Sequence, residues 1–181
     1  MSVTVADEGN RRKGDMTQDE VDQCVTDIKA WLQRSGLKCD ENDQASTLDI
    51  QKLEKSIDLQ IPQTLQSILK IANGGIYFFD KELLSTSQIA GIYSSMEDSK
   101  QWKASLLPFA GDESAMLVVD CSSKGGRVLE WDCDDGLGDV VDCGNTVASY
   151  IENYRNLILA GSCEFIKGCG VVEKMNSKAR K

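Results

Sequence analysis

The stretch SLLPFAGDESAMLVVDCSSKGGRVLEWDCDDGLGDVVD, residues 105–142, decides the fold. It holds four short apolar segments, at 106–110, 116–120, 127–131 and 139–142, and the sequences GDES, SSKGG and DCDDGLG separate them. Short apolar segments divided by glycine, serine and aspartate are typical of strands joined by tight turns. The sequence therefore predicts an antiparallel meander.

Helical patterns precede and follow this meander. Thr17 and Glu20 form a capping box, and an apolar stripe with helical spacing then continues to Gly36. Further helices are predicted at 47–57, at 62–72, within 85–103, and from about 145 to Gly161, with a strand at 76–79. The predicted class is α+β: an antiparallel or mixed sheet, with strands mainly in 76–142, covered by N-terminal helices and a closing C-terminal helix. The predicted core consists of Leu53, Ile61, Leu65, Ile68, Leu69, Ile76, Phe109, Leu117, Val119, Ile151 and Tyr154.

The composition suits one domain with short tails. Hydrophobic residues make up 41% of the 181 residues and charged residues 27%, which is enough apolar material for one core. We expect a disordered leader at 1–16, a single domain at 17–163 and a C-terminal tail at 164–181. No apolar run approaches the roughly 18 residues of a membrane-spanning helix, and the N-terminus lacks the apolar stretch of a secretion signal. An intracellular, cytoplasmic protein without membrane association is the expectation.

The chain has seven cysteines, no CxxC pair and no histidine. Histidine is the commonest general base and the usual partner of a nucleophilic serine or cysteine, so most hydrolytic triads are excluded. Cys163 and Cys169 could form a disulfide or a metal pair if the chain folds back there, but free thiols are favoured inside a cell. We predict reduced cysteines, no metal and no cofactor.

The net charge of −9 is concentrated in the meander. Residues 112–142 hold nine acids and two bases, a local net charge of −7. Such a segment repels nucleic acids and anionic membranes, and it attracts basic proteins or cations. A solvated sheet edge has the same composition, and that interpretation stays open beside the first.

Three acids around the first turn raise the question of catalysis. Asp112 and Glu113 flank the predicted turn tip and Asp120 ends the next strand, but no base, nucleophile or oxyanion donor accompanies them in sequence. We therefore interpret these carboxylates as residues that mark strand ends.

The segment WDCDDGLGD, residues 131–139, invites a calcium interpretation. An EF-hand that starts at Asp132 would place its glycine at Leu137 and its bidentate glutamate at Cys143, so a type I′-like turn at Asp135-Gly136 is favoured. Trp131 lies between two acids and faces either the core or an acidic surface; core packing is the preferred alternative.

Five motifs in order resemble the SUKH superfamily, the Smi/Knr-like domain of fungal cell-wall assembly regulators and bacterial toxin-immunity proteins. They are IQKLEKSIDLQIP (50–62), ILKIANGG (68–75), LPFAGD (107–112), VLEWDCDDG (128–136) and VASYIENY (147–154). The resemblance is strongest over residues 48–161. It implies a non-catalytic protein-binding or regulatory module.

Together with the acidic meander, this resemblance suggests docking of a protein partner with a basic surface, without nucleic acid or membrane. The candidate partner-binding residues are Asp112, Glu113, Glu130, Trp131, Asp132, Asp134 and Asp135. Two alternatives are an immunity-type inhibitor of a basic toxin and, less favoured, an enzyme that uses carboxylates or a metal at 112–142.

Overall fold

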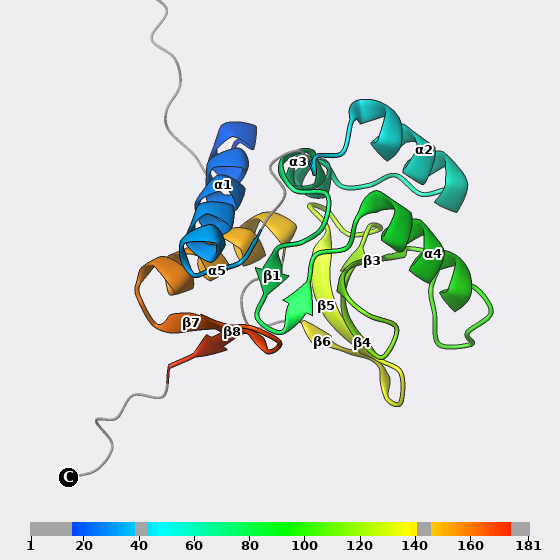
Figure 1. Cartoon of the computed structure of the whole chain (residues 1–181). Coiled ribbons are helices and arrows are strands. Elements are labelled where there is room, and N and C mark those ends of the chain that lie inside the picture. The colour runs from blue at the N-terminus through cyan, green and yellow to red at the C-terminus, as the bar shows by residue number, and fades with distance from the viewer. Residues whose placement is uncertain (1–15, 39–42, 141–145, 175–181) are drawn as a thin grey trace, which may run out of the picture.

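A four-stranded antiparallel meander forms the centre of the protein, and helices cover both of its faces (Figure 1). This computed structural model describes residues 16–38, 43–140 and 146–174. The elements are α1 (Gln18–Arg34), α2 (Thr47–Ile57), α3 (Gln63–Ile71), β1 (Tyr77–Phe78), β2 (Lys81–Glu82), α4 (Thr86–Met96), β3 (Leu106–Gly111), β4 (Ala115–Asp120), β5 (Arg127–Asp132), β6 (Gly136–Val140), α5 (Val147–Leu159), β7 (Cys163–Ile166) and β8 (Gly170–Glu173). The predicted α+β class is confirmed.

Local signals in the sequence start most of the helices. Side chains at Thr17, Ser46, Ser85 and Thr146 each accept a hydrogen bond from the backbone of the first turn. These contacts satisfy amide groups that have no partner inside the helix. Pro62 precedes α3 and makes no side-chain cap. None of the described helices combines the length and the apolar character needed to cross a membrane.

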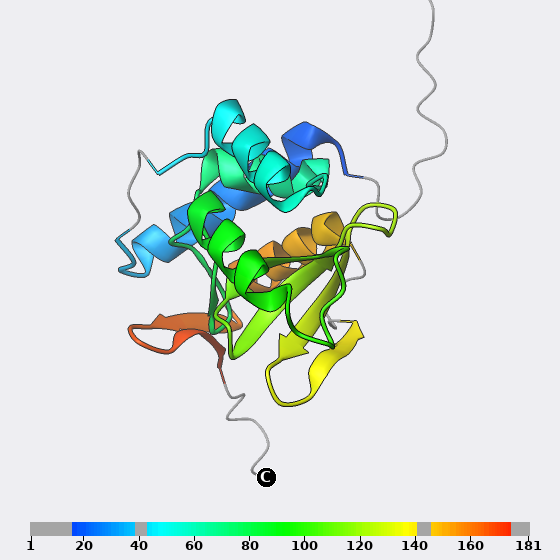
Figure 2. The same cartoon turned by 90° about the vertical axis from the view of Figure 1, so that its right-hand side faces the viewer.

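The two faces of the meander contribute to two cores. Leu107, Phe109 and Val119 join the main core with α1, α3 and α5. Leu106 and Met116 join a second, smaller cluster that α4 covers with Ile92 and Met96. Figure 2 shows α4 on one side of the sheet and α5 on the other. All eleven residues of the predicted core are buried.

The end of the meander differs from the prediction. Asp132 pairs with Gly136, so the hairpin loop consists of residues 133–135, and β6 begins three residues earlier than expected. A type I′ turn needs a positive φ at both central residues, but only Gly136, with a φ of +77°, has one; Asp135 does not. The predicted type I′-like turn at Asp135-Gly136 is therefore wrong.

A C-terminal hairpin, β7 and β8, has no counterpart in the sequence prediction. Its Val171 amide donates a hydrogen bond of 2.8 Å to the carbonyl oxygen of Phe79. Gly170 fits against that same carbonyl, where a side chain would collide. Figure 1 shows the hairpin beside β1 and below α5.

The helix α1 packs on α5, where Arg155 forms a salt bridge with Asp27 at 2.5 Å.

The structure describes five of the seven cysteines and only part of the two terminal segments. Cys24, Cys121, Cys133, Cys163 and Cys169 are free, and Cys163 is buried whereas Cys169 is exposed. Cys39 and Cys143 lie outside the described residues, as do most of the expected leader and the last part of the expected tail.

Candidate functional site

Two acidic turns meet at one end of the meander. The backbone N–H of Cys133 donates a hydrogen bond of 2.9 Å to the carbonyl oxygen of Ser114. This contact continues the register in which Ala115 of β4 faces Asp132 of β5. The β3–β4 turn and the β5–β6 turn therefore lie side by side. We call their five exposed acids the acidic end: Asp112, Glu113, Asp132, Asp134 and Asp135.

The first acid of each turn orders the loop that follows it. Asp112 accepts hydrogen bonds from the side chain and the N–H of Ser114, the latter at 2.9 Å, and from the N–H of Ala115 at 3.2 Å. These bonds lower the pKa of Asp112 below its usual range, with a smaller contribution from Lys81. Asp132 accepts in the same way from the N–H of Asp134 at 2.8 Å.

The other acids of the acidic end are exposed. Glu113 is exposed and accepts a hydrogen bond of 3.3 Å from the Ser95 hydroxyl of α4. Asp134 and Asp135 are exposed at the loop of the second hairpin. Lys81 of the β1–β2 hairpin forms a salt bridge of 2.8 Å with Asp80. The acidic end is therefore a negative surface with ordered turns beneath it.

Glu130 and Trp131 lie apart from the other candidates. Glu130 is exposed, but it lies two residues before Asp132 on β5, opposite Leu117. Trp131 is only 3% exposed and belongs to the second core cluster. Its ring lies 5.1 Å from that of Trp102 in an edge-to-face arrangement. Because Trp131 is buried, its indole is not accessible to a partner.

Three side chains that could ligate a metal lie together at the second turn. Ligand atoms of Asp132, Cys133 and Asp134 lie within 4.8 Å of one another, and all three residues are exposed. Desolvation and the neighbouring carboxylates of Asp134 and Asp132 raise the pKa of the Cys133 thiol.

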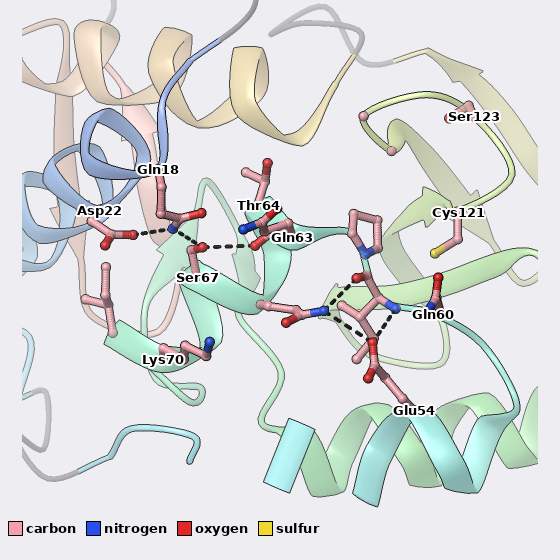
Figure 3. A pocket seen from close by; sticks show the side chains of 16 residues that line it. Gln18, Asp22, Glu54, Gln60, Gln63, Thr64, Ser67, Lys70, Cys121 and Ser123 are labelled. Carbon is pink, nitrogen blue, oxygen red and sulfur yellow. Dashed lines mark hydrogen bonds between the residues drawn. The ribbon is translucent and has the colours of Figure 1, made fainter. Parts of the chain in front are cut away.

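Sequence analysis missed a groove of about 840 Å³ that crosses α3 (Figure 3). The start of α1 borders it on one side and the β4–β5 turn on the other, with residues 60–62 between them. Turns alternate between the ends of a meander, so the β4–β5 turn lies at the opposite end from the acidic end (Figure 2). The molecule thus has two separate surface features.

Two hydrogen-bond networks hold one wall of the groove and the loop between its walls. At one side, Gln18 donates to Asp22 at 2.7 Å and to the hydroxyl of Ser67, which donates to the carbonyl of Gln63 at 2.9 Å. Ser67 is only 5% exposed. These bonds attach the start of α1 to α3.

The second network fixes the loop before α3. Oε1 of Glu54 accepts from the N–H of Ile61 at 3.0 Å and from the side chain of Gln66 at 3.2 Å. Gln66 also donates to the carbonyl of Ile61 at 3.0 Å. Glu54 and Ile61 both belong to the first motif of the resemblance, IQKLEKSIDLQIP. Their spacing was the one sequence signal that could have led to this groove.

The groove also contains a thiol of low reactivity. Desolvation, with a smaller effect of Asp120, raises the pKa of Cys121 to about 12. The nucleophilic form of cysteine is the thiolate. Cys121 therefore contributes a neutral, largely unreactive surface to the groove.

The architecture defines the class of protein: an α+β domain with an antiparallel meander between an N-terminal group of helices and a closing helix. A family model described as the SMI1 / KNR4 family (SUKH-1) matches residues 44–153, more than half of the chain. The chain belongs to this family. Among curated proteins, none matches the sequence at a significant level. The match excludes α1 and the β7–β8 hairpin.

Proposed function

We propose that this protein is a non-catalytic, cytoplasmic binding module that docks a basic protein partner at the acidic end. The observation that carries the proposal is the hydrogen bond between Cys133 and Ser114, because it brings the acids of two turns onto one surface. Membership of the SMI1 / KNR4 family supports a binding role, since the resemblance implies regulators and immunity proteins.

The electrostatics of the acidic end suit fast association with a cationic surface. Five exposed carboxylates share one end of the sheet, and hydrogen bonds from Ser114 and Ala115 lower the pKa of Asp112 below that of an ordinary aspartate. Clustered charge of one sign attracts an oppositely charged partner over long range and raises the association rate. The turns are already ordered, so binding costs little loop entropy.

Enzymatic use of these carboxylates has less support. General acid–base chemistry needs a donor and an acceptor aimed at a common substrate position. The acids of the acidic end instead bond groups of their own turns, accept from Ser95 in the case of Glu113, or face solvent. This geometry favours binding over catalysis.

Affinity purification with mass spectrometry under reducing conditions tests the proposal. The bait is the full chain, beside a variant with Asp132, Asp134 and Asp135 changed to Asn. We expect basic proteins that the wild type retains and the variant loses at moderate salt. A set of partners that both baits retain equally would contradict docking at the acidic end.

The same experiment separates two kinds of binding module. A regulatory scaffold should retain several partners of moderate affinity. An immunity-type inhibitor should retain a single basic toxin with very slow dissociation. Titration of each retained partner measures which of these two patterns the protein follows.

A further inference from the structure

The groove across α3 offers hydrogen-bonding groups that the fold does not use. We propose that it binds an extended, uncharged peptide segment of a protein partner, as a second docking surface independent of the acidic end. This inference goes beyond the proposed function, because it concerns another end of the molecule and another kind of recognition.

The size and rigidity of the groove suit such a ligand. Its volume of about 840 Å³ lies within the range of roughly 300–1,000 Å³ that is usual for ligand pockets. The network of Ser67 fixes the α1 wall, and the network of Glu54 fixes the loop before α3, without a ligand. A pre-formed groove loses little conformational entropy on binding.

Amide and hydroxyl side chains face the groove without a hydrogen bond to any described residue. This description fits the side chains of Gln60, Gln63 and Thr64. The backbone of Gly125, on the opposite wall, also has no hydrogen bond to a described residue. Figure 3 shows Gln63 and Thr64 at the start of α3 and Gln60 on the loop before it. A glutamine amide both donates and accepts, which matches the alternating N–H and C=O groups of an extended peptide.

The rest of the lining disfavours other ligand classes. Among the described residues that line the groove, Lys70 is the single cation and there is no aromatic ring. Phosphates and nucleic acids need several cations, and bases bind by stacking on aromatic rings. Ile61, Pro62 and Ile71 provide apolar surface for aliphatic side chains of a peptide.

Charged peptides gain little from this groove. The carboxylates of Asp22 and Glu54 already accept hydrogen bonds from Gln18, Ile61 and Gln66, which engages one oxygen of each. The charged residues of the lining are Asp22, Glu54 and Lys70, so its net charge is small. Binding here should therefore depend weakly on salt, unlike binding at the acidic end.

Panning a phage-displayed library of short linear peptides on the full chain tests the inference. The selected peptides are synthesised with a fluorophore, and anisotropy measures their affinity. We expect Thr64→Trp, which fills the groove, to weaken binding by about tenfold or more. The matched control Lys55→Trp, on the exposed face of α2, should leave affinity within about twofold. Removing the charges of Asp132, Asp134 and Asp135 should also change little.

Hydrogen–deuterium exchange of the wild type with a selected peptide gives a second readout that needs no variant. We expect slower exchange at residues 60–66 and 121–126. Enrichment of no peptide, or equal affinity for Thr64→Trp, would overturn the inference. A third outcome would also overturn the inference: peptides that bind less tightly when the acidic end is neutralised and that do not slow hydrogen exchange in the groove. Such peptides would support the proposed function instead.

Discussion

The amide of Cys133 donates a 2.9 Å hydrogen bond to the carbonyl oxygen of Ser114, and this bond joins the tips of two hairpins. Each hairpin carries its own acids, and neither turn alone holds all five. The acidic end exists because the β4–β5 register places Ala115 opposite Asp132. A one-residue slip of that register would also turn Trp131 out of the core.

Leu69→Ala should lower the free energy of unfolding by about 2–5 kcal/mol. Leu69 is fully buried on α3, within the main core, so the truncation leaves a cavity. Urea denaturation measures the change. The control Leu48→Ala, at a residue 58% exposed on α2, should change stability by less than about 0.5 kcal/mol. Equal effects of both variants would show that the α3 face is assigned wrongly.

Glu54→Ala should destabilise the protein by about 1–3 kcal/mol, because the Ile61 amide loses its acceptor in a half-buried loop. Glu54→Gln keeps a carbonyl oxygen at this position and should recover much of the loss. Thermal or chemical denaturation compares the two. Identical stabilities of the Ala and Gln variants would mean that the hydrogen bond to Ile61 contributes nothing.

Asp112→Asn should reduce the dependence of stability on acid pH. Hydrogen bonds from Ser114 and Ala115 lower the pKa of Asp112 in the folded state. Its ionised form therefore stabilises the fold above the unfolded pKa of about 3.9, and this contribution is lost as the pH falls through the lower folded pKa. Urea denaturation at neutral and acid pH should show the wild-type advantage shrink on acidification. An advantage that is the same at both pH values would contradict this account.

All seven cysteines should titrate as free thiols in denaturant without reductant. Burial raises the pKa of Cys24 and of Cys121, which keeps these thiols protonated and slow to oxidise. Ellman's reagent counts the groups. A count of five or fewer would demonstrate at least one disulfide.

Much of the fold follows from short-range signals. Capping residues and apolar periodicity predicted α1, α2 and α5, and glycine-rich turns predicted the strands of the meander. The exact hairpin at residues 133–135 could not be predicted, because a glycine after several aspartates is compatible with hairpin loops of more than one length. The β7–β8 hairpin was not predicted, and its contact with the rest of the fold, the hydrogen bond from Val171 to Phe79, joins residues far apart in the sequence.

The candidate site was predictable only in part. The excess of acids was visible in sequence, but the meeting of the two turns depends on strand register. Alternation could not decide the direction of Trp131, and the structure places it in the core with Trp102. The groove was not predicted, because α1, α3 and the β4–β5 turn come together only in three dimensions.

The association rate of a purified basic partner with the protein, measured by stopped flow across a series of salt concentrations, tests the central claim most directly. The variant changes Asp132, Asp134 and Asp135 to Asn, and asparagine tolerates the same turn conformations. A control with the same change in charge replaces Asp19 with Asn, and Glu164 and Glu173 with Gln; all three acids are exposed and outside the acidic end. Docking at the acidic end predicts that the first variant associates about threefold or more slowly at low salt and shows a flatter salt dependence, while the control stays close to the wild type. Equal rates and equal salt dependence for the wild type and the first variant would contradict the claim.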